Sequence, residues 1–166
     1  MTIYLAADHT GFEIKEKVKK FLQDKAYQVE DCGAYALEKD DDYPQFMHTA
    51  AEKVALDPQN SRGIIFGGSG QGEAMVANKV KGIRCALFYA PAAPVQAINV
   101  EGNTSEDPFT MLVLTRQHNN ANMLSLGVRF LSEEDILRAI ILWLETPASQ
   151  NERHVRRIKQ MGELEK

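Results

Sequence analysis

Short apolar runs alternate along this chain with longer stretches in which apolar residues recur three or four positions apart. The short runs are typical of buried strands, and the wider spacing is typical of amphipathic helices. The runs predict five strands, at residues 2–7, 27–31, 63–66, 83–88 and 121–127. Strands that alternate with helices form a parallel sheet covered on both faces. The pattern therefore predicts one α/β domain over residues 1–166, with a three-layer Rossmann-like fold and a five-stranded parallel sheet.

The periodic stretches predict the helices. They lie at residues 11–25, 44–56, 74–80, 108–119, 132–146 and 149–165, with a further short helix near residues 94–100. The last helix is basic, and its apolar face is thin, made of Val155, Ile158, Met161 and Leu164. We expect this C-terminal helix to pack on a partner subunit.

Composition narrows the class of protein. The chain is 44% hydrophobic and 25% charged, and its net charge of −4 gives no reason to expect nucleic acid as a partner. No apolar run approaches the roughly 18 residues of a membrane span. The four histidines lack zinc spacing, and the dinucleotide and Walker motifs are absent. We expect a cytoplasmic protein that needs no membrane, metal or cofactor and keeps Cys32 and Cys85 reduced.

The strongest chemical signal is a glycine-dense turn, Gly67-Gly68-Ser69-Gly70-Gln71-Gly72-Glu73, between a predicted strand and a helix. Free N–H groups at a helix start bind anions, and glycines let a ligand approach the main chain. A carboxylate there would repel a resident phosphate, so Glu73 fits better as a proton-transfer group beside an oxyanion hole. A helix-start carboxylate stabilised by the dipole explains the same position equally well. Ser69 is predicted to be a hydroxyl donor in the turn, because Gln71 occupies the second glycine position of a hydrolase elbow.

Other polar side chains accompany the turn. Asp8, His9 and Arg129 follow the first and fifth predicted strands, whose carboxyl ends lie at the ligand-binding edge of such a sheet. Arg153 and Arg157 are four residues apart, so they share one helix face and can grip a phosphate. The plainer interpretations are a turn aspartate, a surface histidine at His118 and a solvated basic face.

Together these segments resemble the ribose-5-phosphate isomerase B and galactose-6-phosphate isomerase family. The resemblance rests on motifs spread in order over nearly the whole chain: Asp8-His9-Thr10-Gly11-Phe12, Asp42-Tyr43-Pro44, Gly68-Ser69-Gly70-Gln71-Gly72-Glu73, Ala77-Asn78-Lys79, Gly82-Ile83-Arg84-Cys85-Ala86-Leu87, His118-Asn119-Asn120-Ala121-Asn122, Leu126-Gly127-Val128-Arg129 and Arg153-His154-Val155-Arg156-Arg157. The family interconverts aldose and ketose phosphates without a metal, through an enediolate.

The resemblance implies a role for each matching residue. Asp8 and His9 would bind sugar hydroxyls, Tyr43 would line the pocket, and residues 68–72 (Gly68, Ser69, Gly70, Gln71, Gly72) would form the anion hole. His118 would assist ring opening, Asn119 would touch the substrate, and Arg129, Arg153 and Arg157 would hold the phosphate. It also implies a homodimer or homotetramer with shared active sites. Many members carry a cysteine base just before the glycine turn. Gly67 stands there in this chain, and Glu73 resembles the base of the other branch.

One segment departs from the family. The 34 positions from Arg84 to His118 exceed the usual number, and the excess lies around residues 90–107. This extra segment is either a surface addition or a wall of the sugar pocket. Ribose 5-phosphate is therefore the first expected substrate, and a six- or four-carbon sugar phosphate is the alternative. A non-catalytic sugar-phosphate-binding subunit of a mixed complex is a third hypothesis.

Overall fold

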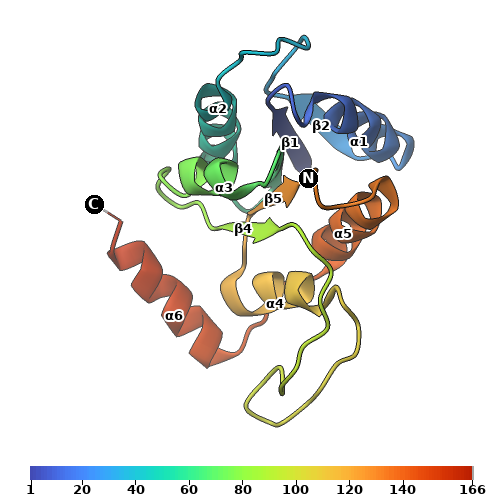
Figure 1. The fold of residues 1–166 in the computed structure, drawn as a ribbon. Coiled ribbons are helices and arrows are strands. Elements are labelled where there is room, and N and C mark those ends of the chain that lie inside the picture. Colours follow the sequence, from blue (N-terminus) through green and yellow to red (C-terminus); the bar gives the residue numbers. More distant parts are fainter. Residues whose placement is uncertain (166) are drawn as a thin grey trace.

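A computed structural model describes residues 1–165 and contains the predicted parallel sheet (Figure 1). Its strands are β1 (Thr2–Ala7), β2 (Gln28–Asp31), β3 (Ser61–Gly67), β4 (Cys85–Phe88) and β5 (Met123–Gly127). They are all parallel, in the order β2-β1-β3-β5-β4. The chain order reverses direction between β1 and β3, and such a switch point opens a crevice at the carboxyl ends of the strands.

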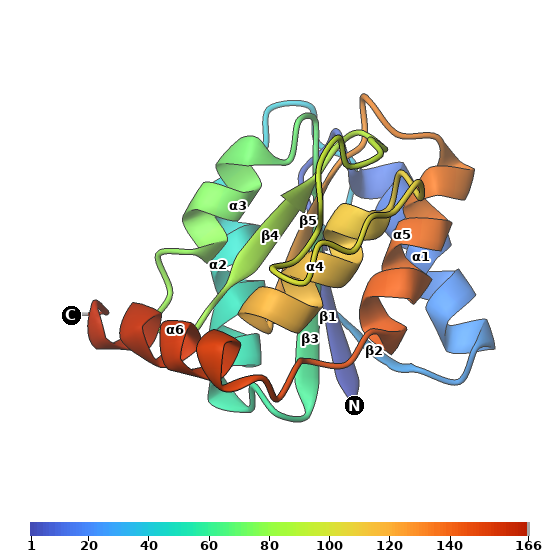
Figure 2. The ribbon, with the colours of Figure 1, turned by 90° about the horizontal axis from the view of Figure 1, so that it is seen from below.

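Helices cover both faces of the sheet, which completes the predicted three layers (Figures 1 and 2). They are α1 (Phe12–Asp24), α2 (Tyr43–Leu56), α3 (Gln71–Ala77), α4 (Thr110–Asn119) and α5 (Glu133–Glu145). The last helix, α6 (Glu152–Glu163), extends away from the sheet and buries none of its residues (Figure 1). Helices α1, α4 and α5 bury apolar side chains in one core with Ile64 and Phe66. Helices α2 and α3 share a second core with Ile65. Successive residues of β3 therefore face opposite layers, as strand geometry requires.

The short helix predicted near residues 94–100 is wrong. Residues 89–109 form an irregular excursion from the sheet between β4 and α4, and its tip is a turn in which the Ile98 N–H donates to the Asn103 carbonyl (2.8 Å). Pro94 lacks an N–H, and the residue before a proline disfavours helical geometry. Local apolar spacing was therefore outweighed by turn chemistry.

The strand register brings together the polar segments that follow β1, β3 and β5, because the three strands end within one residue of each other. Ala7 pairs with Phe66, and Phe66 pairs with Leu126, so β1, β3 and β5 end together. β3 and β5 continue for one further pair, Gly67 with Gly127, so Asp8, Gly68 and Val128 are the first residues after the three strands. Sequence-distant polar segments are thus neighbours because the three strands end in register.

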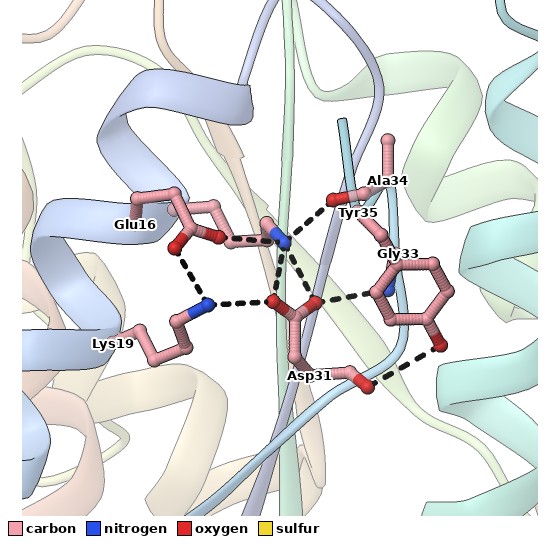
Figure 3. A network of polar contacts seen from close by, with 7 residues as sticks. Glu16, Lys19, Asp31, Gly33, Ala34 and Tyr35 are labelled. Atoms are coloured by element: carbon pink, nitrogen blue, oxygen red, sulfur yellow. Dashed lines mark hydrogen bonds and ion pairs between the residues drawn. The ribbon is translucent and has the colours of Figure 1, made fainter. Parts of the chain in front are cut away.

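A buried ion-pair network supports this edge from the side of β2 (Figure 3). The Lys15 ammonium, with a fully buried side chain, donates to both carboxylate oxygens of Asp31 (2.6 and 2.7 Å) and to the Ala34 carbonyl (2.7 Å). Lys19 and the Gly33 N–H also donate to Asp31. The network ties α1 to the chain that leaves β2 and leads toward Asp41 and Tyr43.

Replacing Lys15 by methionine should lower the free energy of unfolding by about 3 kcal/mol, because the change leaves a buried acceptor and a half-paired carboxylate. Replacing Lys19, which is partly exposed, should cost about 1 kcal/mol or less. Urea unfolding at pH 7 measures both free energies. Equal losses for the two substitutions would contradict the larger contribution that we assign to Lys15.

Acid should weaken the same network. Burial raises the pKa of Asp31, but hydrogen bonds from Lys15, Lys19 and Gly33 outweigh burial and hold that pKa below its ordinary value. A carboxyl with a lowered folded pKa stabilises the fold above its unfolded pKa, and this contribution is lost as pH falls through the folded pKa. The stability gap between the wild type and Lys15→Met should therefore narrow in acid.

Candidate active site

The carbonyl groups of the glycine turn accept hydrogen bonds from β5 and the residues that follow it, so the N–H groups of the turn point away from β5. The Gly67 carbonyl accepts from Val128 N–H (3.0 Å), and the Gly68 carbonyl accepts from Arg129 N–H (3.1 Å). The Gly70 carbonyl accepts from the Ser125 hydroxyl (2.7 Å). In a trans peptide the next N–H points opposite to the carbonyl. The N–H groups of residues 68 and 69 therefore face away from β5 and can converge on an anion. The Gln71 N–H faces the same way, where it makes a long bond to the Ser69 hydroxyl.

Glycine is required at the turn for two separate reasons. Gly70, which caps α3, has a φ of 73°, a left-handed conformation that other residues rarely adopt. A Cβ on Gly68 would lie 3.0 Å from the Arg129 guanidinium carbon, and one on Gly72 would lie 2.6 Å from the Tyr43 hydroxyl. Arg129 and Tyr43 therefore lie against the main chain of the turn.

Glu73 lies in the first turn of α3 and is only 5% exposed. Its Oε2 is buried, with no hydrogen-bond partner within residues 1–165. Burial is the main cause that raises its pKa, and the Asp8 carboxylate adds to this, while its own backbone N–H and Arg129 oppose it. A buried carboxylate with a raised pKa suits a general base better than a surface group that merely complements the helix dipole.

Gly67 makes room for this carboxylate. A Cβ on Gly67 would lie 1.8 Å from Glu73 Oε1 and 2.0 Å from its carboxyl carbon, so any side chain there excludes the observed Glu73 position. A cysteine at position 67 and a carboxylate in this place are mutually exclusive, which explains why Gly67 and Glu73 occur together.

Replacing Gly67 by alanine should displace Glu73. Glu73 is the expected base, and a shift of about 1 Å at such a group should lower kcat by about 10²-fold. Steady-state kinetics and the melting temperature Tm measure the change. If the clash is the cause, Gly67→Ala should lower the Tm of the wild type and leave that of a Glu73→Ala chain unchanged. Equal losses in both backgrounds would refute it.

His9 is held by Asp41, a residue that sequence reasoning missed. His9 Nδ1 lies 2.7 Å from Asp41 Oδ1, and the His9 backbone N–H donates to the same oxygen (3.0 Å). The Asp41 side chain is 6% exposed. The acidic run at 40–42 was the available signal, but only the fold shows that it returns to the end of β1. Because this contact occupies Nδ1, Nε2 is the ring nitrogen of His9 that is left for a ligand.

Replacing Asp41 by asparagine should lower the pKa of His9. The hydrogen bond to Asp41 is the main cause that raises this pKa; desolvation and Arg129 lower it, and Asp8 adds to the rise. The imidazolium should therefore persist to a higher pH in the wild type than in the variant. NMR titration of the histidine ring protons measures this, with His48 as the internal control. An unmoved His9 midpoint would contradict the assignment.

Asp8 has a structural contact as well as a place in the site. Its Oδ1 accepts from the N–H groups of Thr10 (2.9 Å) and Gly11 (3.2 Å), as expected for a turn aspartate. The residue is buried, and its charge raises the pKa of Glu73. The Ser69 hydroxyl, at the top of the turn, accepts a long bond from Gln71 N–H (3.4 Å).

The remaining predicted site residues lie at the opposite ends of the strands, where β4 and β5 begin. α4 ends at Asn119, just before β5 begins, and the Asn119 carbonyl accepts from the Arg84 side chain (2.9 Å) next to the start of β4. His118, Asn119, Arg153 and Arg157 share a hollow of about 690 Å³ there. One chain therefore does not bring this group together with Glu73.

This second group is cationic. The rings of His118 and His154 are 4.3 Å apart between centroids. Burial is the main cause that lowers the pKa of His118, and His154, Arg153 and Arg157 lower it further. Nδ1 of His154 is buried, with no partner in the described chain. The hollow thus offers a neutral histidine and two guanidiniums to an anion.

In residues 1–165, no three histidine, cysteine, aspartate or glutamate side chains gather closely enough to hold a metal ion. No helix in the same range is both long and apolar enough to cross a membrane.

The fold and site define a three-layer α/β protein with a carboxylate enclosed by an anion-binding turn at the carboxyl edge of its sheet. The family model described as Ribose/Galactose Isomerase matches residues 3–103 and 104–161. The chain belongs to this family, which confirms the resemblance and the predicted fold class.

Individual relatives match this chain over more than nine tenths of their own length. Ribose-5-phosphate isomerase B of Mycobacterium leprae is 40% identical over all of this chain and 91% of its own. The crystal structure of the Mycoplasma genitalium enzyme with bound ribulose-5-phosphate has a TM-score of 0.84 and 32% identity, covering 99% of this chain and 95% of that one. The Thermotoga maritima enzyme has a TM-score of 0.80 and 35% identity, with 98% of both chains covered.

Proposed function

We propose that this protein interconverts ribose 5-phosphate and ribulose 5-phosphate, with Glu73 as the base. The observation that carries the proposal is the buried Glu73 carboxylate beside N–H groups that point away from β5. The relatives named above are ribose-5-phosphate isomerases, and one of them holds ribulose-5-phosphate, which supports this choice of substrate.

The proposed chemistry is proton transfer through an enediolate. Glu73 removes the proton on C2 of the open-chain aldose, and the C2 electrons form the C1–C2 double bond while the negative charge moves to O1. The turn's N–H groups stabilise that charge. Glu73 returns its proton to C1 while the O2 hydroxyl proton moves to O1, so that the C2 carbonyl and the O1 hydroxyl of the ketose form together. The step consumes nothing and needs no metal or cofactor.

We assign the other site residues to binding the substrate. His9 and Asp8 bind sugar hydroxyls, Tyr43 closes the side of the pocket, and Ser69 adds a donor to the turn. Arg129 lies against Gly68, and we assign it to the phosphate together with Arg153 and Arg157. His118 has a lowered pKa, so it is neutral near pH 7 and can accept the ring hydroxyl proton during ring opening.

We infer that two chains complete each site, because Glu73 and His118 lie at opposite edges of one sheet. The surface supports a homodimer or larger homo-oligomer. None of the α6 residues, Glu152–Glu163, is buried by the described chain, and Val155 and Met161 remain exposed on it. Met75 on α3 is exposed as well, beside the free edge strand β4. We place the protein in the cytoplasm, because both thiols are free.

The direct test is an isomerase assay of the purified protein with five- and six-carbon aldose phosphates. We expect turnover of ribose 5-phosphate without added metal and in the presence of a chelator. Binding of ribose 5-phosphate without turnover would favour the non-catalytic subunit, and preference for a six-carbon phosphate would overturn the choice of sugar.

A further inference from the structure

Within the excursion of residues 89–109, residues 92–108 form a hydrogen-bonded loop. Its base is closed by a hydrogen bond from Ala92 N–H to the Pro108 carbonyl (2.9 Å). Its tip is held by the Ile98–Asn103 bond and by the Asn99 side chain, which accepts from Asn103 N–H (3.0 Å).

The excursion is also anchored to the body of the protein. Asp107 forms an ion pair with Arg138 on α5 (2.9 Å). Phe109, which follows directly, is buried against Phe88 of β4, with ring centroids 5.5 Å apart. The Arg138 guanidinium lies 4.1 Å from the centre of the Phe109 ring. Because its base is fixed at these points, the path of the excursion is set by the fold.

That path leads to the cationic hollow. The excursion runs past α4 toward the start of α6 (Figures 1 and 2). Residues 97–101 line the same 690 Å³ hollow as His118, Arg153 and Arg157. The tip presents Ala97, Ile98 and Val100 to the hollow, together with the polar side chains of Asn99 and Glu101. Asn99 Oδ1 already accepts from the Asn103 N–H within the tip.

We propose that the tip of the excursion is a specificity element, a wall that limits the length of the sugar phosphate accepted. The inference rests on the proposed function, in which the hollow receives the substrate's phosphate. Two guanidiniums fix the phosphate on α6, and the reacting carbons must reach Glu73 of another chain. Any additional carbon must then fit between these two fixed ends, beside the wall formed by residues 97–101.

Such a wall would discriminate between sugar phosphates of different length, because a longer sugar fits poorly and leaves a hydroxyl group without a hydrogen-bond partner. An additional hydroxyl-bearing carbon next to Ile98 or Val100 loses water without gaining a hydrogen bond. Misfits of one carbon in a shaped pocket typically change kcat/KM by about 10- to 200-fold. The excursion should therefore favour five-carbon over six-carbon aldose phosphates.

The test compares two tryptophan variants and one shortened chain. Val100→Trp adds bulk at the wall; Val95→Trp adds the same bulk to the same excursion at a 97% exposed position that does not line the hollow. In the shortened chain, residues 94–106 are replaced by Gly-Gly, which preserves the Ala92–Pro108 closure. Each protein is assayed with ribose 5-phosphate and with six-carbon aldose phosphates, and calorimetry measures the Kd for ribose 5-phosphate.

We expect Val100→Trp to lower kcat/KM and weaken binding of ribose 5-phosphate by about tenfold or more, with Val95→Trp within twofold of the wild type. The shortened chain should raise the six-carbon to five-carbon ratio of kcat/KM by about tenfold. The proposal is overturned if the two tryptophan variants behave alike, or if a folded shortened chain keeps the wild-type ratio. Failure of the wild type to turn over any aldose phosphate would count against the proposed function, and the Kd comparison would still decide the role of the wall.

Discussion

Glu73→Gln should lower kcat for ribose 5-phosphate by about 10²–10⁴-fold, the usual contribution of a positioned general base. Glutamine has nearly the same shape, but it cannot take a proton from C2. Exchange of deuterium from C2 into solvent isolates this step, since it requires proton removal but not product release. We expect the variant to bind ribose 5-phosphate and to lose this exchange. Exchange at the wild-type rate would remove Glu73 from the mechanism.

The melting temperature of Glu73→Gln, measured as a function of pH, shows whether the variant folds and whether Glu73 has a raised pKa. Burial raises the pKa of Glu73, so the folded protein holds this proton more tightly than the unfolded chain does. Stability of the wild type should therefore fall as pH rises from the unfolded pKa through the raised folded pKa. Glutamine cannot ionise, so Glu73→Gln should melt at a higher Tm than the wild type at pH 8. The difference should shrink near pH 4, where both side chains are neutral.

Mixing two inactive variants should restore activity. A chain with Glu73→Gln keeps the guanidiniums of α6, and a chain with Arg153→Ala and Arg157→Ala keeps the base. If each site takes Glu73 from one chain and the arginines from another, a mixed dimer contains one intact site. Random reassortment of a twofold dimer should then return about a quarter of wild-type activity.

Reassortment needs a step that separates the chains, such as co-expression or mild denaturation and refolding of the mixture. The control is a chain that carries all three substitutions, mixed with the Glu73→Gln chain. No intact site can form in that mixture, so its activity should stay at the level of the single variants. If the first mixture also stays inactive, although mixed dimers are shown by mass spectrometry, the shared site is refuted.

Local patterns in the sequence predicted most of the secondary structure, for identifiable reasons. β1, β3 and β5 are short runs of buried residues bounded by turns, and amphipathic spacing places α1 and α5 correctly. The spacing failed at residues 94–100, where proline and a hydrogen-bonded turn outweigh apolar periodicity. Boundaries also moved where side chains cap a helix: α6 begins at Glu152 because the Asn151 side chain accepts from Arg153 N–H.

The sequence by itself determined the α/β class, the family and the glycine turn with its acid, because these depend on residue types at short, ordered spacings. Three features needed the tertiary structure: the space beside Gly67 that Glu73 fills, the pairing of Asp41 with His9, and the placement of the His118 group at the far edge. The last two depend on contacts between segments many residues apart, and the first depends on how the glycine turn folds Glu73 back against Gly67. Such distances follow from strand order and register, which local spacing does not encode.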